Sequence, residues 1–190
     1  AAHVPELKMF FNDTTRIRIP AGYDTELISQ VPTLQAGTLR RIKVLAGLSD
    51  EQLTRFLKFV EVKEAKPFAE VMRQGQPGDA MFLILQGEVR VRMMIAGKES
   101  VLANLSSGDF FGEISLFDHG PRSADVLTNE ETILLRISAA SFEKMVHEAP
   151  ELAAPFLLGM GKTLTARIRA DNKRYGESVV YSRLGLDVRP

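Results

Sequence analysis

Two residues that together could hold a phosphate-bearing ligand, Glu113 and Arg122, stand nine positions apart in the stretch FGEISLFDHGPRSADVLT, residues 111–128. Gly112 permits a sharp turn into a short helical segment, and free backbone N–H groups at such a helix start favour an anion. The Pro-Arg pair at 121–122 closes the loop and returns Arg122 to the same neighbourhood. A guanidinium fork matches two phosphate oxygens and is always charged. These residue types predict a phosphate site.

The glutamate in this stretch needs a separate explanation, because a carboxylate repels a phosphate. Glu113 fits the site if it accepts hydrogen bonds from sugar hydroxyls instead of meeting the phosphate. A carboxylate for ribose and an arginine for phosphate together indicate a nucleotide. The alternative is a salt bridge between Glu113 and Arg122 that pins a surface loop, and the residue types alone favour neither reading.

The composition limits the classes of function. Lys plus Arg and Asp plus Glu both total 24, so the net charge is zero and gives no support to broad electrostatic binding of nucleic acid or anionic membrane. The chain has no cysteine, which excludes disulfides and cysteine catalysis and suits a cytoplasmic protein. The longest uncharged run, residues 27–39, is too short to span a bilayer, so no membrane segment is expected.

The elements that must position these residues are predicted from periodicity. Ser49 and Gln52 resemble a capping box at the start of a helix, and a further helix capped by Ser141 is expected after residue 138. Between the helical parts, short strand-like runs alternate with turn signals, which favours an antiparallel sandwich or barrel. The expected strands lie within residues 59–65, 69–75, 80–94, 99–105, 124–129 and 132–138.

Three segments of the chain resemble the cyclic nucleotide-binding domain family. They read LAGLSDEQL at 45–53, GQPGDAMFLILQGEVRV at 75–91, and GDFFGEISLFDHGPRSADV at 108–126. The last is similar to the family's phosphate-binding cassette. The resemblance covers roughly residues 38–175. It implies a mainly β, α+β fold: an eight-stranded antiparallel β-roll, jelly-roll-like, flanked by N-terminal helices and a long C-terminal helix.

The resemblance also implies a set of ligand-binding residues. Gly112 and Glu113 would meet the ribose and phosphate region, and Arg122 would bind the exocyclic phosphate oxygens with help from Ser123 and nearby amides. Phe111 is expected to pack under the cassette. The remaining members of the implied site are Ile114, Ser115 and Ala124 in the cassette, Val91, Leu102 and Leu105 around the base, and Arg167 on the long helix.

Arg167 departs from the pattern of the bacterial catabolite activators in this family, in which a threonine on the long helix contacts adenine. An arginine there could reach the O6/N7 edge of guanine, as arginine does in nucleic acids. We expect instead that Arg167 faces solvent. Cyclic AMP is therefore the expected ligand ahead of cyclic GMP, with no metal cofactor.

Other classes of function fit the sequence less well. A cupin-like metalloenzyme needs clustered histidines, and the chain has only His3, His119 and His147. The stretch GKTLTA at 161–166 lacks the first glycine of a P-loop. No catalytic constellation is found, so the protein is predicted to be a non-enzymatic sensor. The alternative is a scaffold that keeps the β-roll without its ligand.

The expected organisation has four parts: an N-terminal extension at 1–37, the β-roll with its flanking helices at 38–150, the long helix at 151–176, and a tail at 177–190. Only about fifteen residues follow Tyr175, too few for a helix-turn-helix, so no direct DNA binding is expected. The long helix carries Leu157, Met160, Leu164 and Ile168, which are expected to cover the roll, to pair two copies as a homodimer, or both. The effector protein is not identified by the sequence.

Overall fold

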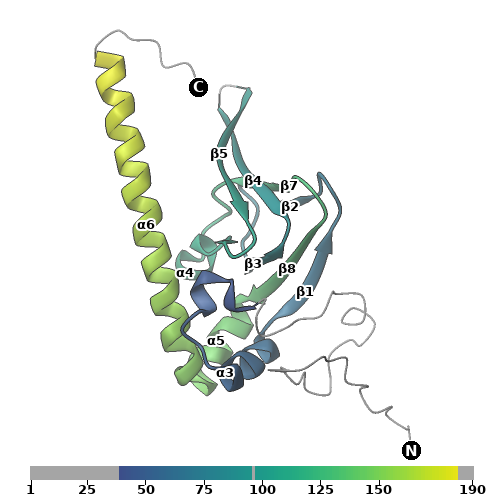
Figure 1. Cartoon of the computed structure of the whole chain (residues 1–190). Coiled ribbons are helices and arrows are strands. Elements are labelled where there is room, and N and C mark those ends of the chain that lie inside the picture. Colours follow the sequence, from purple (N-terminus) through teal and green to yellow (C-terminus); the bar gives the residue numbers. More distant parts are fainter. Residues whose placement is uncertain (1–38, 96, 184–190) are drawn as a thin grey trace, which may run out of the picture.

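The computed structural model describes residues 39–95 and 97–183. The expected N-terminal extension and the end of the expected tail lie outside these ranges. The described chain forms eight antiparallel strands in two four-stranded sheets, with helices at one end and along one side (Figure 1). This confirms the predicted fold class. The strands are β1 (Glu61–Ala65), β2 (Glu70–Met72), β3 (Ala80–Gln86), β4 (Glu88–Ile95), β5 (Lys98–Ser106), β6 (Phe110–Phe111), β7 (Asp125–Thr128) and β8 (Thr132–Ser138).

The two sheets have the orders β1-β8-β3-β6 and β2-β7-β4-β5. Consecutive strands therefore alternate between the sheets over much of the chain, which rolls the sheet up instead of producing a simple meander. The sequence of β3 reflects its place between the second sheet and the helices. In β3, Phe82 and Ile84 face the second sheet, whereas Met81 and Leu83 face the helices, so β3 is apolar on both sides.

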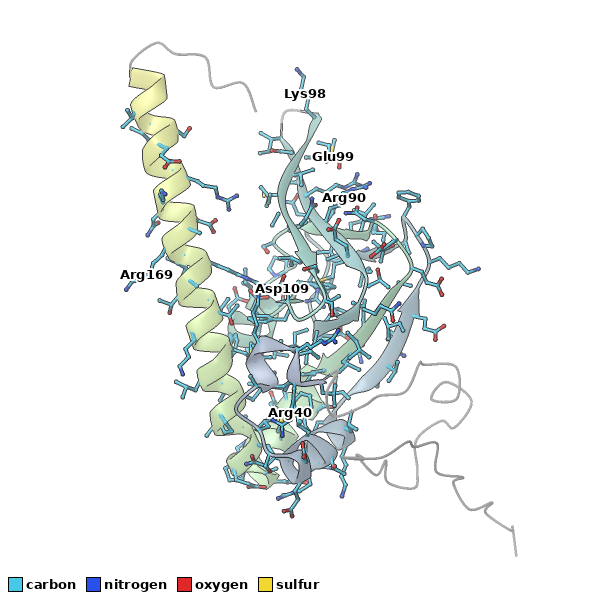
Figure 2. The ribbon with its side chains drawn as sticks, in the orientation of Figure 1. Arg40, Arg90, Lys98, Glu99, Asp109 and Arg169 are labelled. Atoms are coloured by element: carbon cyan, nitrogen blue, oxygen red, sulfur yellow. The ribbon has the colours of Figure 1, made fainter. Side chains whose placement is uncertain are left out.

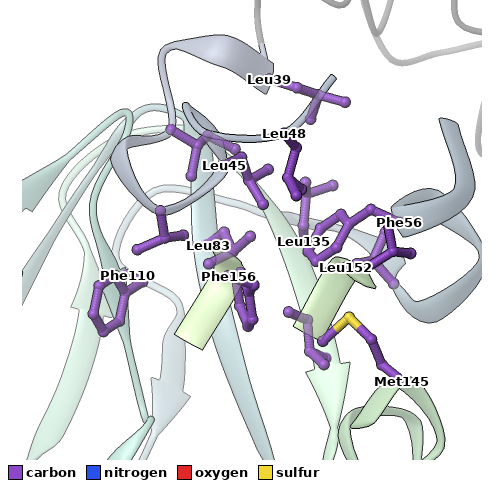
Figure 3. Close-up of a cluster of buried hydrophobic side chains, with 14 of the residues drawn as sticks. Leu39, Leu45, Leu48, Phe56, Leu83, Phe110, Leu135, Met145, Leu152 and Phe156 are labelled. Atoms are coloured by element: carbon purple, nitrogen blue, oxygen red, sulfur yellow. The ribbon is translucent and has the colours of Figure 1, made fainter. Parts of the chain in front are cut away.

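The helices pack on the outer face of the first sheet. They are η1 (Lys43–Leu45), α3 (Asp50–Phe56), η2 (Leu57–Phe59), α5 (Ala139–Glu148) and α6 (Pro150–Arg183), while the short α4 (Ile114–Asp118) lies between β6 and β7. Figure 3 shows the buried cluster that joins these helices to the sheet. In it Phe56 and Phe156 meet with ring centroids 5.3 Å apart, and Leu83 and Leu135 come from the strands.

The helix starts are capped as the local sequence requires. Ser49 and Gln52 form the predicted capping box, with reciprocal bonds of 3.2 and 2.9 Å. The prediction for the next helix was wrong by one turn: Ser138, not Ser141, is the N-cap of α5, and its hydroxyl accepts from the Ser141 amide at 3.0 Å. The strand β8 thus runs directly into α5.

The long helix α6 is fixed to the roll by its first half. Pro155 cannot donate to the Glu151 carbonyl, and the Gln52 side chain donates to that carbonyl instead, at 3.0 Å. A side chain at Gly159 would come within 2.8 Å of the Val44 carbonyl, so glycine permits close contact between α6 and η1. The helix continues through Gly176 to Arg183, with its second half on the side of the β4–β5 hairpin (Figure 1). Arg174 Nη1 lies 3.5 Å from the Leu102 carbonyl oxygen of β5.

Candidate functional site

The segment between β6 and β7 turns sharply at Gly112 and enters α4. Gly112 has a φ of +77°, and a Cβ there would lie 2.9 Å from Arg122 Nη1 and 3.2 Å from the Ala80 carbonyl oxygen. Both the left-handed backbone and the close approach therefore require glycine. The first amides of α4, those of Ile114 and Ser115, follow this turn and have no acceptor within the helix.

Arg122 lies beneath this turn and is 6% exposed. Its Nη1 donates to the Ala80 carbonyl at 2.6 Å and to the Gly112 carbonyl at 3.0 Å, while Nη2 lies 3.7 Å from Asp79 Oδ1. Burial lowers the pKa of Arg122, which Asp79 opposes, and the guanidinium stays charged at neutral pH. One edge of the guanidinium thus braces backbone, which fixes the side chain for contact with an anion on the other edge.

The turn between β2 and β3 holds the cassette from the opposite side. Arg122 donates its backbone N–H to the Gln76 carbonyl at 2.8 Å, and the Gly75 N–H donates to the Arg122 carbonyl at 2.9 Å. A Cβ on Gly78 would lie only 2.2 Å from the Ser115 Cβ and 3.2 Å from Arg122 Cδ. Gly78 therefore sets how closely this turn approaches both α4 and the arginine.

Glu113 is the N-cap residue of α4 and is 7% exposed. Burial raises the pKa of its carboxyl, and a hydrogen bond from its own backbone and the charge of Arg167 partly oppose that rise. Arg167 Nη1 lies 3.8 Å from Glu113 Oε1. The structure does not pair Glu113 with Arg122 as the alternative reading required; each has other partners.

Most of the predicted site residues come together, and a few do not. Gly112, Glu113, Ile114, Ser115 and Arg122 share the turn and the start of α4, where the Ile114 side chain is exposed and Ser115 is buried. Ser123 is exposed and Ala124 is buried in the same loop. The remaining predicted residues come from β4, β5 and α6.

The strand residues divide into two groups. Val91 and Leu105 pack against the cluster between the sheets, as expected for residues that line the inside of the roll. Leu102 does not join them. The β4–β5 register shifts between the pairs Val91–Ala103 and Arg92–Val101, which leaves Leu102 unpaired and 39% exposed. Phe111 is buried and stacks on Phe82 at 5.1 Å between ring centroids, beneath the cassette.

The expectation that Arg167 faces solvent is wrong. Its Nη2 donates to the Phe110 carbonyl at 2.7 Å, and its guanidinium lies 4.5 Å from the centroid of the Phe110 ring. The helical periodicity of α6 could not reveal this, because the pattern does not say which face of the distal helix meets the roll.

Two further residues, Gly78 and Asp79, contact the site, and neither was among the predicted site residues. Their signal was present in the sequence, since GQPGD is part of the stretch that resembles the family. Within residues 39–95 and 97–183, no three His, Cys, Asp or Glu side chains gather in a way that could hold a metal ion. Among the helices of these same residues, none combines the length and apolar character that crossing a membrane needs.

The fold and the site define a β-roll domain with a buried arginine and a buried glutamate at the start of α4. Residues 62–149 match the sequence model of the cyclic nucleotide-binding domain. This region, 88 of the 190 residues (149 − 62 + 1), is thus identified as a cyclic nucleotide-binding domain.

Known proteins with similar sequences include bacterial and animal regulators. The CRP-like cAMP-activated global transcriptional regulator of Mycobacterium tuberculosis is 25% identical over 142 residues, which are 74% of this chain and 62% of that protein. The cGMP-dependent protein kinase, isozyme 1, of Drosophila melanogaster is 32% identical over 118 residues, 60% of this chain and 15% of the kinase. The chain thus spans less than two thirds of the length of either relative.

A solved structure supports the same assignment of fold. The crystal structure of a cyclic nucleotide-binding domain from Methylobacillus flagellatus superposes with a TM-score of 0.66 at 28% identity, over 73% of this chain and 78% of that one. The likeness therefore includes helices as well as the strands of the roll.

Proposed function

We propose that this protein is a non-enzymatic sensor of a cyclic nucleotide, with cyclic AMP preferred to cyclic GMP. The observation that carries the proposal is the buried guanidinium of Arg122, held by two backbone carbonyls beside the first turn of α4. A buried cation braced in this way suits a compact anion such as a cyclic phosphate. The relatives activated by or dependent on cyclic AMP and cyclic GMP support the ligand class.

Each part of the ligand has a matching group. Arg122, Ser123 and the amides of Ile114, Ser115 and Ala124 would hold the phosphate, while Glu113 would accept from the ribose hydroxyls. Val91 and Leu105 would contact the base from inside the roll, with Leu102 at its edge. The preference for cyclic AMP rests on Arg167, because both of its terminal nitrogens are directed to Phe110 and Glu113 and not to a guanine edge.

The output of the sensor would pass through α6. The helix would have two positions in equilibrium. The ligand shifts this equilibrium only as far as its affinity for the protein differs between the two positions. Ile168 and Tyr175 are 58 and 74% exposed, and they stand seven residues apart on α6, so they lie on the same side of the helix. We infer that this side of α6 pairs two copies as a homodimer, and that the dimer acts on an effector protein in the cytoplasm.

The direct test is a binding titration with variants of the phosphate-binding arginine. Arg122→Ala should abolish measurable binding, and Arg122→Lys should weaken it less, because the charge remains without the fork. Arg73→Ala removes an exposed arginine of the β2–β3 turn and is the matched control. Since Arg122 also braces backbone, thermal melting of each ligand-free variant must show that it is folded.

Two results would contradict the proposal. A folded Arg122→Ala protein with unchanged affinity would remove Arg122 from the site. Absence of binding by the wild type to both nucleotides would favour the scaffold alternative, in which the roll serves a protein partner.

A further inference from the structure

Arg167 connects the long helix to the candidate ligand site. It comes from α6, about halfway along, and reaches the start of β6 through Phe110 and the start of α4 through Glu113. Arg169, two residues further on, points away from the roll (Figure 2). The two arginines therefore sit on different sides of the same helical turn, and only Arg167 contacts the site.

The position of Arg167 is fixed by groups other than the ligand site. Its Nη2 donates to the Phe110 carbonyl at 2.7 Å, and its guanidinium stacks over the Phe110 ring at 4.5 Å. Phe110 is fully buried in the main core cluster. A planar guanidinium held at one nitrogen and on one face has little freedom left, so its second nitrogen, Nη1, is directed by the core toward Glu113.

The distance between Arg167 and Glu113 determines what the pair can do. At 3.8 Å, Nη1 and Glu113 Oε1 attract each other but do not form a hydrogen bond. The carboxylate oxygens thus keep their capacity to accept from other donors while a cation compensates their charge in a buried place. A hydrogen-bonded salt bridge between the two side chains would instead have occupied those oxygens.

We propose that Arg167 is a positioning residue that holds Glu113 as a charged, oriented acceptor for the sugar hydroxyls of the ligand, and does so only while α6 is docked on the roll. This inference rests on the proposed function. Arg167 acts through Glu113 and does not itself touch the ligand. Because the arginine belongs to α6 and the carboxylate to the cassette, docking of the helix and binding of the ligand favour each other reciprocally.

The surroundings of Glu113 support this assignment. The charged groups near it are Arg167 from α6, and Arg122, whose Nη1 donates to the adjacent Gly112 carbonyl and whose Nη2 faces Asp79 from the start of β3. Arg122 already contacts two backbone carbonyls and Asp79, and it would also bind the proposed phosphate. Arg167 is therefore the cation placed to compensate the Glu113 charge, and burial without it would raise the pKa of that carboxyl further.

The test is a double-mutant cycle measured by nucleotide titration with cyclic AMP. Arg167→Gln should weaken binding about tenfold, as expected for a coupling of ordinary size. Arg167→Lys, which keeps the charge, should recover part of that loss, and Arg169→Gln should change nothing. In a Glu113→Gln background, Arg167→Gln should have little further effect, because the group on which it acts has been removed.

Two outcomes of the cycle would overturn the inference. Unchanged affinity in Arg167→Gln would show that Glu113 needs no positioning. An equal loss in both backgrounds would show that Arg167 meets the ligand directly, as the guanine-edge hypothesis requires.

A second measurement does not depend on nucleotide binding and so separates this inference from the proposed function. Carboxyl carbon NMR of the ligand-free protein gives the pKa of Glu113, which Arg167→Gln should raise and Arg169→Gln should leave unchanged. If the wild type binds neither nucleotide, the proposed function fails, yet this titration still decides the Arg167–Glu113 coupling. An unchanged pKa in Arg167→Gln would refute it.

Discussion

Replacing Gly78 by alanine tests whether the turn between β2 and β3 sets the geometry of the site. The added Cβ would lie 2.2 Å from the Ser115 Cβ, whereas ordinary contact begins at 3.4 Å, so the two backbones must separate by about 1.2 Å (3.4 − 2.2). Rotation of the serine cannot relieve the clash, because the Cβ itself is the obstacle. Ser115 is also 2% exposed, which leaves it no room to retreat.

The expected cost follows from this overpacking. Gly78→Ala should lower the free energy of unfolding by about 1–3 kcal/mol, the usual range for inserting a methyl group into a filled space. The same displacement moves α4 relative to Arg122, whose Cδ lies 3.2 Å from the new methyl group. Nucleotide binding should therefore weaken by roughly tenfold or more, since a displacement of about 1 Å misaligns a preorganised site.

The assay combines denaturant unfolding with nucleotide titration on the wild type and three variants. Gly47→Ala is the control, because a Cβ on Gly47 would meet nothing within 4 Å. Adding Ser115→Gly to Gly78→Ala removes the clashing atom and should restore part of the lost affinity, which makes the effect specific to this contact. Wild-type stability and affinity in Gly78→Ala would refute the claim that the turn positions the cassette.

Three further predictions follow from other contacts. Phe68 has a φ of +62° in the β1–β2 turn and is 68% exposed, so Phe68→Gly should raise the free energy of unfolding by about 0.5–1 kcal/mol in a denaturant titration; an unchanged or lower value would mean that the turn stores no strain. Burial raises the pKa of Glu113 above its value in the unfolded chain. Between these two pKa values the folded protein binds more protons than the unfolded chain, so the free energy of unfolding falls as the pH rises through this window. Glu113→Gln should therefore stabilise the ligand-free protein at neutral pH while weakening nucleotide binding, and its advantage should vanish in acid below the ordinary value; a Glu113→Gln protein less stable than wild type at neutral pH would contradict this. Ile168→Asp should shift the proposed homodimer to monomer in sedimentation equilibrium, whereas Ala166→Asp, on the opposite side of α6, should not; equal behaviour of the two would exclude pairing through the side that carries Ile168.

The parts of this molecule that could be predicted from sequence are those specified locally. The capping box at Ser49 and Gln52 depends on two residues three positions apart, and it forms as expected. The short strand-like runs predicted an antiparallel sandwich or barrel, and the resemblance to the family predicted the β-roll. The motif around Gly112, Glu113 and Arg122 identified a cluster that the fold does bring together.

The parts that could not be predicted depend on which surfaces meet. Gly78 and Ser115 are 37 positions apart (115 − 78), and nothing in either local pattern indicates that they touch. The orientation of Arg167 depends on how α6 is seated earlier along its length, where Gly159 contacts Val44. Periodicity located the apolar residues of α6 but not the rotation of its distal half against the roll, and so the contact between Arg167 and Phe110 was missed.

The most direct test of the central claim is calorimetric titration of the full chain with cyclic AMP and cyclic GMP, side by side. We expect saturable binding at about micromolar affinity or tighter, with cyclic AMP the tighter ligand. Tighter binding of cyclic GMP would contradict the base preference while preserving the sensor. Each titration is run at two temperatures, because a binding enthalpy that happens to be zero at one temperature is not zero at the other. Absence of binding heat with both nucleotides at both temperatures would contradict the account.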